Sequence, residues 1–146
     1  MSDPGPPTSE HAAIACFVRD TLGCSCPDET LRRIRLSDGR GGAAPRGVSA
    51  VVEVGGRLLI YLVDGRRLQP ATVTDVAVAG RHARDAQGFN RFRLVLAGAG
   101  DGGPEAAALT AAFQAAAGVD DRAHLHAVPA RDLPDSLKVL IQPRPA

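Results

Sequence analysis

Aromatic side chains and lysine are both scarce in this chain of 146 residues. It contains no Trp and a single Tyr, and aromatic residues make up 3% of the sequence. Proteins that bind single-stranded nucleic acid stack its bases on aromatic rings, so this function is not expected, and the core must be aliphatic. Lys138 is the only lysine among 17 basic residues. This bias indicates a GC-rich bacterial genome, so the arginine excess is not interpreted as phosphate recognition.

Long apolar runs and a large net charge of either sign are also missing. No apolar run approaches the ~20 residues of a membrane helix, and the first ten residues lack the basic start and apolar stretch of a secretory signal. The formal net charge of +1 creates no broad field for nucleic acid or anionic lipid. We therefore expect a cytoplasmic protein that binds neither membrane nor nucleic acid; a protein partner is left open.

The length is typical of one domain. Residues 1–7 hold three prolines and a glycine, which predicts a disordered leader. The single domain is expected at 8–141, with a flexible tail at 142–146.

Apolar periodicity predicts four helices and four strands. Val48 to Val54 alternates, Gly55-Gly56 is typical of a two-residue hairpin turn, and Arg57 to Val63 is apolar on both faces, as in a covered central strand. Residues 37–47 are expected to form a loop, and SLKVLIQ a strand or a half-turn of helix. The helices are expected at 9–22, 27–34, 72–86 (capped near Thr72 and Asp75) and 104–117, and the other strands at 92–97 and 124–128.

Strands separated by helices require crossover connections and favour a parallel sheet. The predicted fold class is therefore α/β: a single domain with a mixed sheet of four to five strands, flanking helices and one β-hairpin. If residues 73–79 were a strand, the arrangement would be α+β.

Three cysteines, Cys16, Cys24 and Cys26, lie within eleven residues. An intracellular protein keeps its thiols reduced. Cys26 lies directly before Pro27, at a predicted helix N-terminus where free N–H groups stabilise a thiolate. The Cys24/Cys26 pair is therefore a candidate redox or metal site. Cys16 is a third candidate, although a lone cysteine usually packs as a small apolar residue.

The segment FVR-x-x-LGC-x-CP, from Phe17 to Pro27, resembles a stretch shared by small uncharacterised prokaryotic proteins. A second similarity lies in residues 88–93. No activity is known for that family, so the resemblance implies only that the Gly-Cys-x-Cys-Pro unit recurs.

His124 and His126 lie two residues apart in a predicted strand, so both rings are expected on one face of the sheet. Together with two cysteines they would complete a tetrahedral site for a transition metal such as zinc. The alternative is that both lie on a half-exposed edge strand. Arg91 and Arg93 also share a strand face, where they either bind an anion or pair with carboxylates.

The loop from Gly98 to Gly103 matches G-x-G-x-x-G, with Gly98, Gly100 and Gly103 at the glycine positions. It lies between a strand and a helix, as a phosphate-binding loop does. Asp101 and Pro104 argue against a bound phosphate, because one adds negative charge and the other removes a donor.

Three functions follow from these patterns. The first is a thiol site at Cys24 and Cys26 that is redox-active or binds metal. The second is a non-catalytic interaction or structural domain whose cysteines are structural. The third, with less support, is phosphate or nucleotide binding at the Gly98–Gly103 loop. The sequence does not decide whether the protein is an enzyme.

Overall fold

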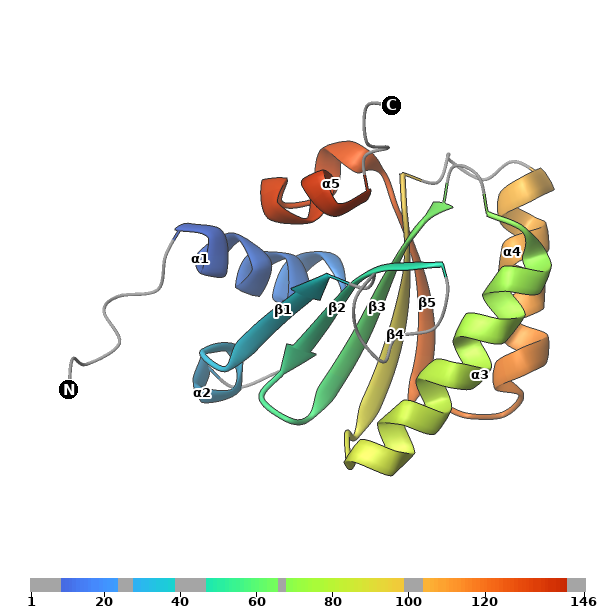
Figure 1. Cartoon of the computed structure of the whole chain (residues 1–146), viewed down its shortest axis with the longest axis horizontal. Helices are drawn as coiled ribbons and strands as arrows, with labels where there is room; N and C mark the ends of the chain where they lie inside the picture. The colour runs from blue at the N-terminus through green and yellow to red at the C-terminus, as the bar shows by residue number, and fades with distance from the viewer. Residues whose placement is uncertain (1–8, 24–27, 39–46, 66–67, 99–103, 142–146) are drawn as a thin grey trace.

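A five-stranded mixed β-sheet with helices on both faces organises the protein (Figure 1). The computed structural model describes residues 9–23, 28–38, 47–65, 68–98 and 104–141. The predicted leader at 1–7 and tail at 142–146 lie outside the described residues. The α/β fold class predicted from the sequence is confirmed.

Among the described residues, three helical segments and three strands come first, and helices and strands alternate from the third strand to the fifth. In order they are α1 (Ser9–Cys16), the π-helix η1 (Phe17–Thr21), α2 (Asp28–Leu31), β1 (Ile34–Asp38), β2 (Val48–Val54), β3 (Leu58–Asp64), α3 (Pro70–Gln87), β4 (Arg91–Ala97), α4 (Pro104–Ala117), β5 (Ala123–Val128), the 3-10 helix η3 (Ala130–Asp132) and α5 (Asp135–Ile141).

The strands lie in the sheet in their sequence order, β1-β2-β3-β4-β5. The pairs β1–β2 and β2–β3 are antiparallel, whereas β3–β4 and β4–β5 are parallel. The predicted hairpin is β2–β3. Its turn glycines, Gly55 and Gly56, have φ angles of 57° and 69°, a left-handed conformation that glycine adopts without steric cost.

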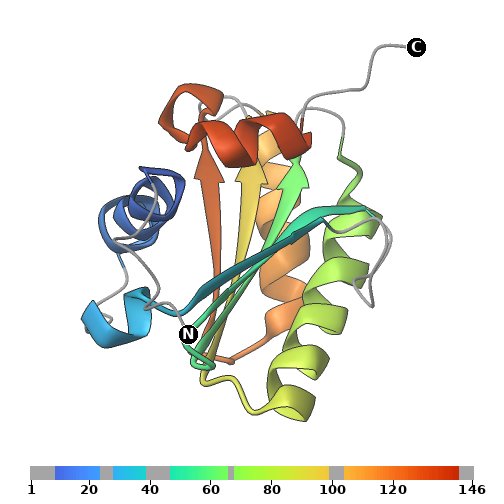
Figure 2. The same ribbon diagram turned by 60° about the vertical axis from the view of Figure 1, so that its left-hand side comes forward.

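The central strand β3 is buried on both faces, as its unbroken apolar sequence predicts. α3 and α4 cover one face, and α1 lies on the other (Figure 2). Leu58, Ile60 and Leu62 belong to the core on the α1 side, which also includes Leu137 of α5. The core on the α3 side contains Leu59, Tyr61 and Val63 of β3, with Val73, Val76 and Ala77 of α3.

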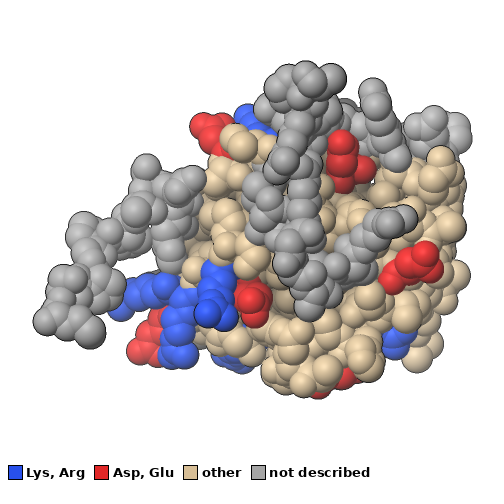
Figure 3. Space-filling view, viewed as in Figure 1, with Lys and Arg blue, Asp and Glu red and all other residues tan. Residues whose placement is uncertain are grey.

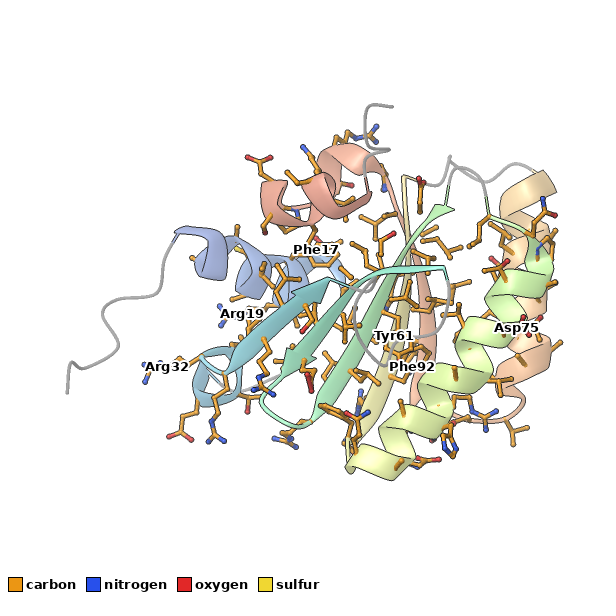
Figure 4. The ribbon with its side chains drawn as sticks, viewed as in Figure 1. Phe17, Arg19, Arg32, Tyr61, Asp75 and Phe92 are labelled. Carbon is orange, nitrogen blue, oxygen red and sulfur yellow. The ribbon has the colours of Figure 1, made fainter. Side chains whose placement is uncertain are left out.

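The backbone of α3 packs tightly against the sheet at Gly80. A Cβ atom at this position would overlap the ring of Phe92 on β4. The Phe92 ring lies edge-to-face against Tyr61, with the ring centroids 5.2 Å apart (Figure 4). The glycine therefore allows the helix backbone to pack directly on an aromatic pair.

The structure differs from the sequence predictions at several element boundaries. The helix expected at 27–34 ends at Leu31, and β1 begins at Ile34 and extends into the expected loop. The N-cap of α3 is Gln69, with Pro70 at the first turn, rather than Thr72. SLKVLIQ lies mostly within helix α5, which buries Leu137 against the sheet.

Within the described residues, no helix combines the length and apolar character needed to cross a membrane. On the face shown in Figure 3, basic and acidic side chains lie close together at the α2–β1 end of the protein. The described residues on that face show no extended surface of one charge.

Candidate functional site

Arg93 on β4 is a buried arginine at the centre of the candidate site. Its side chain lies on the α1 side of the sheet, because it alternates with Phe92 and Leu94, which face α3. It is only 7% exposed. Burying a guanidinium is costly unless its charge and its N–H groups are satisfied, so the partners of Arg93 are informative.

Two groups distant in the sequence meet at one nitrogen of Arg93. Nη1 donates a hydrogen bond of 2.9 Å to the carbonyl oxygen of Leu22, and it lies 2.7 Å from Nε2 of His126. A guanidinium has donors only, so Nε2 accepts and the neutral ring carries its proton on Nδ1. The fold thus joins the chain before the Cys-x-Cys segment to the histidine strand.

One donor of the Arg93 guanidinium has no partner among the described residues. Its Nε is buried without a hydrogen-bond partner. None of the ion pairs among the described residues includes Arg93, although pairing with a carboxylate was one of the two expectations for it. Arg93 is therefore a desolvated cation with a spare donor, which is the arrangement that an anion would satisfy.

Burial and neighbouring charge shift the pKa values of both partners. Desolvation, followed by the charge of Arg91, lowers the pKa of Arg93 from its ordinary value. Desolvation also lowers the pKa of His126 to about 4, with smaller contributions from Arg93 and His124. His126 is therefore neutral at pH 7, consistent with its role as hydrogen-bond acceptor.

The π-helix η1 positions the Leu22 carbonyl. The N–H of Leu22 donates to the oxygen of Phe17, 3.0 Å away, five residues earlier. This wider turn buries Phe17 and Val18 against the sheet; Figure 4 shows Phe17 on the sheet side of η1. Such π-turns occur often at functional sites, and nothing in the local sequence predicted this one.

The structure describes only one of the three candidate cysteines. Cys24 and Cys26 lie outside the described residues. Cys16 ends α1 and is exposed, and its Sγ donates a weak hydrogen bond of 3.5 Å to Oδ2 of Asp20. Cys16 contributes nothing to the contacts around Arg93.

His124 and His126 lie on the same face of β5, because Val128, the next residue in that alternation, belongs to the α1-side core. Arg93 is opposite His124 in the parallel register and reaches the ring of His126. Among the described residues, no group of three or more His, Cys, Asp or Glu side chains could hold a metal ion.

Two of the three candidate glycines of the loop, Gly100 and Gly103, lie outside the described residues. Gly98 is described and has a φ angle of 76°. Its N–H donates to the oxygen of Val128, 2.8 Å away. That donor is engaged in the sheet and is not free for a phosphate.

A second buried arginine, Arg84 on α3, has an ordinary structural explanation. Its Nη2 lies 2.8 Å from Oδ2 of Asp120, and Nε of Arg81 donates to the same oxygen at 2.9 Å. Hydrogen bonds from Arg84 and the other donors hold the pKa of Asp120 well below its usual range. These ion pairs fasten α3 to the turn before β5. Arg84, like Arg93, has one buried nitrogen without a partner among the described residues, Nη1. The two arginines differ because Arg93 has no paired carboxylate among those residues.

Comparison of the chain with protein-family models, with curated proteins and with solved structures found no match. The site is therefore interpreted from its own geometry.

Proposed function

We propose that this protein has a redox-active thiol site, with Cys24 and Cys26 as its sulfur groups and Arg93 as the cation that stabilises their thiolate form. The observation that supports the proposal is the buried Arg93, whose Nε has no partner among the described residues. Arg93 is hydrogen-bonded to Leu22, and Leu22 precedes Cys24 by two residues. A thiolate beside a positive charge has a lowered pKa and reacts faster.

Redox chemistry is favoured over metal binding by the contact between Arg93 and His126. Nε2 of His126 already accepts from a guanidinium 2.7 Å away, so it is not available as a ligand. The positive charge of Arg93 also opposes a divalent cation at that nitrogen. A zinc site that uses His126 would require Arg93 to move.

The proposed reaction is thiol–disulfide exchange with a substrate dithiol. A substrate thiolate attacks the Cys24–Cys26 disulfide, which breaks its S–S bond and forms a mixed disulfide. The second substrate thiolate then displaces the bound cysteine, so the substrate becomes a disulfide and gives two electrons to Cys24 and Cys26. Ring strain in a Cys-x-Cys disulfide and a cation that stabilises the reduced form both make the site an oxidant.

The test is the pH dependence of alkylation of the reduced protein by iodoacetamide, with each cysteine quantified by peptide mapping. We expect the pKa of the faster of Cys24 and Cys26 to lie at least one unit below the ~8.5 of a free thiol. In Arg93→Gln this pKa should rise, whereas Arg91→Gln, an exposed arginine two residues earlier on the same strand, should leave it unchanged.

Two results would count against the proposal. One is that Cys24 and Cys26 react no faster than a free thiol at pH 7. The other is that folded Arg93→Gln alkylates like the wild type. A stoichiometric zinc ion in the native mass spectrum, removed by a chelator, would favour the metal site instead. Slow thiols without bound metal would favour an interaction domain with structural cysteines.

A further inference from the structure

β5 forms one outer edge of the sheet and pairs only with β4 among the described strands. The N–H of Phe92 donates to Arg122, and that of Gly98 donates to Val128, so these even-numbered residues of the β5 segment face β4. Backbone groups alternate in direction along a strand. The N–H and C=O groups of the odd-numbered residues Leu125 and Ala127 therefore point outward from the sheet, as does the C=O of Ala123, whose N–H donates to the oxygen of Asp120 at 3.4 Å.

A cavity of about 330 Å³ lies beside this edge, between β5 and α4. The same three residues line it with Phe113 and Ala117 of α4, and Thr110, Gln114, Asp120 and His124 add polar groups to the lining. The outward backbone groups and a recess of mixed polarity are thus side by side. Strand addition uses this combination, since the backbone supplies hydrogen bonds and the recess accepts side chains.

The two edges of the sheet differ in their protection against pairing. Natural edge strands usually carry charges or proline that prevent association with another strand. β1 includes Arg35 and Asp38. β5, with the sequence AHLHAV, contains no Lys, Arg, Asp, Glu or Pro, and His126 is neutral at pH 7 because its pKa is about 4.

The sequence of β5 is symmetric about Leu125, because residues 123–127 read AHLHA in both directions. A two-fold axis at Leu125 pairs Ala123 with Ala127 of the partner subunit and Leu125 with Leu125 of the partner subunit. The Leu125 pair can exchange two hydrogen bonds, as a hydrogen-bonded pair of antiparallel strands does. In each Ala123–Ala127 pair the N–H of Ala127 can donate to the oxygen of Ala123, whose own N–H is bonded to Asp120. His124 lies opposite His126 of the partner subunit, on the other face.

We propose that the protein forms a two-fold symmetric dimer by antiparallel pairing of β5 with β5 of a second copy, which joins the two sheets into one. The occupant is a second copy rather than an unrelated peptide, because one register gives an acceptor to the outward N–H groups of Leu125 and Ala127 in both strands and places like side chains opposite each other. The two cavities then meet on the α4 side, around the paired leucines. Closed symmetry of this kind is the commonest form of homo-oligomer.

Sedimentation of the full chain tests the assembly, and we expect twice the 15.1 kDa of one chain. Ala127→Pro removes one outward N–H without removing a bond to β4, so it should give a folded monomer. Leu36→Pro is the matched control on the opposite edge. Gly55 donates to Arg33, so Leu36 also points its N–H outward, and this variant should remain a dimer.

A cysteine pair tests the register independently of the proline variants. In a background with Cys16, Cys24 and Cys26 changed to serine, Leu125→Cys should form an intermolecular disulfide on mild oxidation, because the two Cα atoms would be about 5.5 Å apart. Ala127→Cys should not, because its two copies would be offset by four residues, or roughly 14 Å.

A monomeric wild type at all concentrations, or equal cross-linking of the two cysteine variants, would overturn the dimer. A folded Ala127→Pro that remains dimeric would do the same. If Ala127→Pro does not fold, the cross-linking comparison decides alone.

Discussion

Replacing Gly80 by alanine tests the contact that fixes α3 on the sheet. The added Cβ would overlap carbon atoms of the Phe92 ring. That ring is fully buried and held against Tyr61, so it cannot turn aside as the end of a flexible side chain could. We therefore expect Gly80→Ala to destabilise the protein although alanine is the better helix former.

Two opposing free energies set the size of the effect. Alanine in place of glycine favours an exposed helix interior by ~1 kcal/mol. Overpacking a buried site costs ~1–3 kcal/mol, and overlap with a fixed ring places this site at the upper end. The net loss in the free energy of unfolding is therefore about 2 kcal/mol. In a chain of this length that lowers the melting temperature by roughly 4–8 °C.

Urea unfolding monitored by circular dichroism measures the loss. Gly118→Ala is the control for backbone strain alone, because Gly118 has a φ angle of 62° and its Cβ would meet nothing within 4 Å; it should cost ~1 kcal/mol. Combining Gly80→Ala with Phe92→Leu should cost less than the sum of the single changes, since the overlap is relieved. A Gly80→Ala protein as stable as the wild type would refute the packing argument.

Three further predictions concern charge and sulfur. Asp120→Asn should lower the free energy of unfolding by ~2 kcal/mol, because Arg84 loses its buried counterion and keeps only its bond to the exposed carboxylate of Asp85. In the wild type the contribution of Asp120, whose pKa is depressed, is full near neutral pH and is lost as the pH falls below about 4. Burial lowers the pKa of His126 from 6.5 to about 4, so its contribution to the free energy of unfolding is full above pH 6.5 and is lost as the pH falls towards 4. His126→Gln should therefore flatten the pH dependence of the free energy of unfolding in that range. An unchanged slope would contradict this prediction. Alkylation at pH 7 should label Cys26 before exposed Cys16, and preferential labelling of Cys16 would contradict the proposed site. The variant Cys26→Ser should stay folded but lose thiol–disulfide exchange.

Local sequence patterns were sufficient to predict most of the strands of the sheet. The Gly55-Gly56 turn and the unbroken apolar β3 define the hairpin, and α3 has a stripe of buried residues at helical spacing. β1 was missed because its five residues, IRLSD, have little strand character of their own. It is extended because it pairs with β2, and such a partner is not visible in the local pattern.

The contact between Arg93 and His126 could not be predicted from the sequence either, because it also depends on pairing between distant segments. Alternation placed the arginines of β4 on one face and the histidines of β5 on one face. Whether Arg93 meets His126 depends on the register of β4 against β5, which pairs Arg93 with His124. The third partner, the Leu22 carbonyl, depends on a π-turn. Both are set by packing between distant segments, not by local propensity.

The two cores differ in when their residues become available during synthesis. The core beneath α3 and α4 draws on residues no later than Ala123 or Leu125, so it can assemble while the C-terminal segment is still being made. The core on the α1 side includes Leu133 and Leu137. It is incomplete until α5 leaves the ribosome, so α1, although it precedes α5 in the chain, gains its complete core only after α5 has been made.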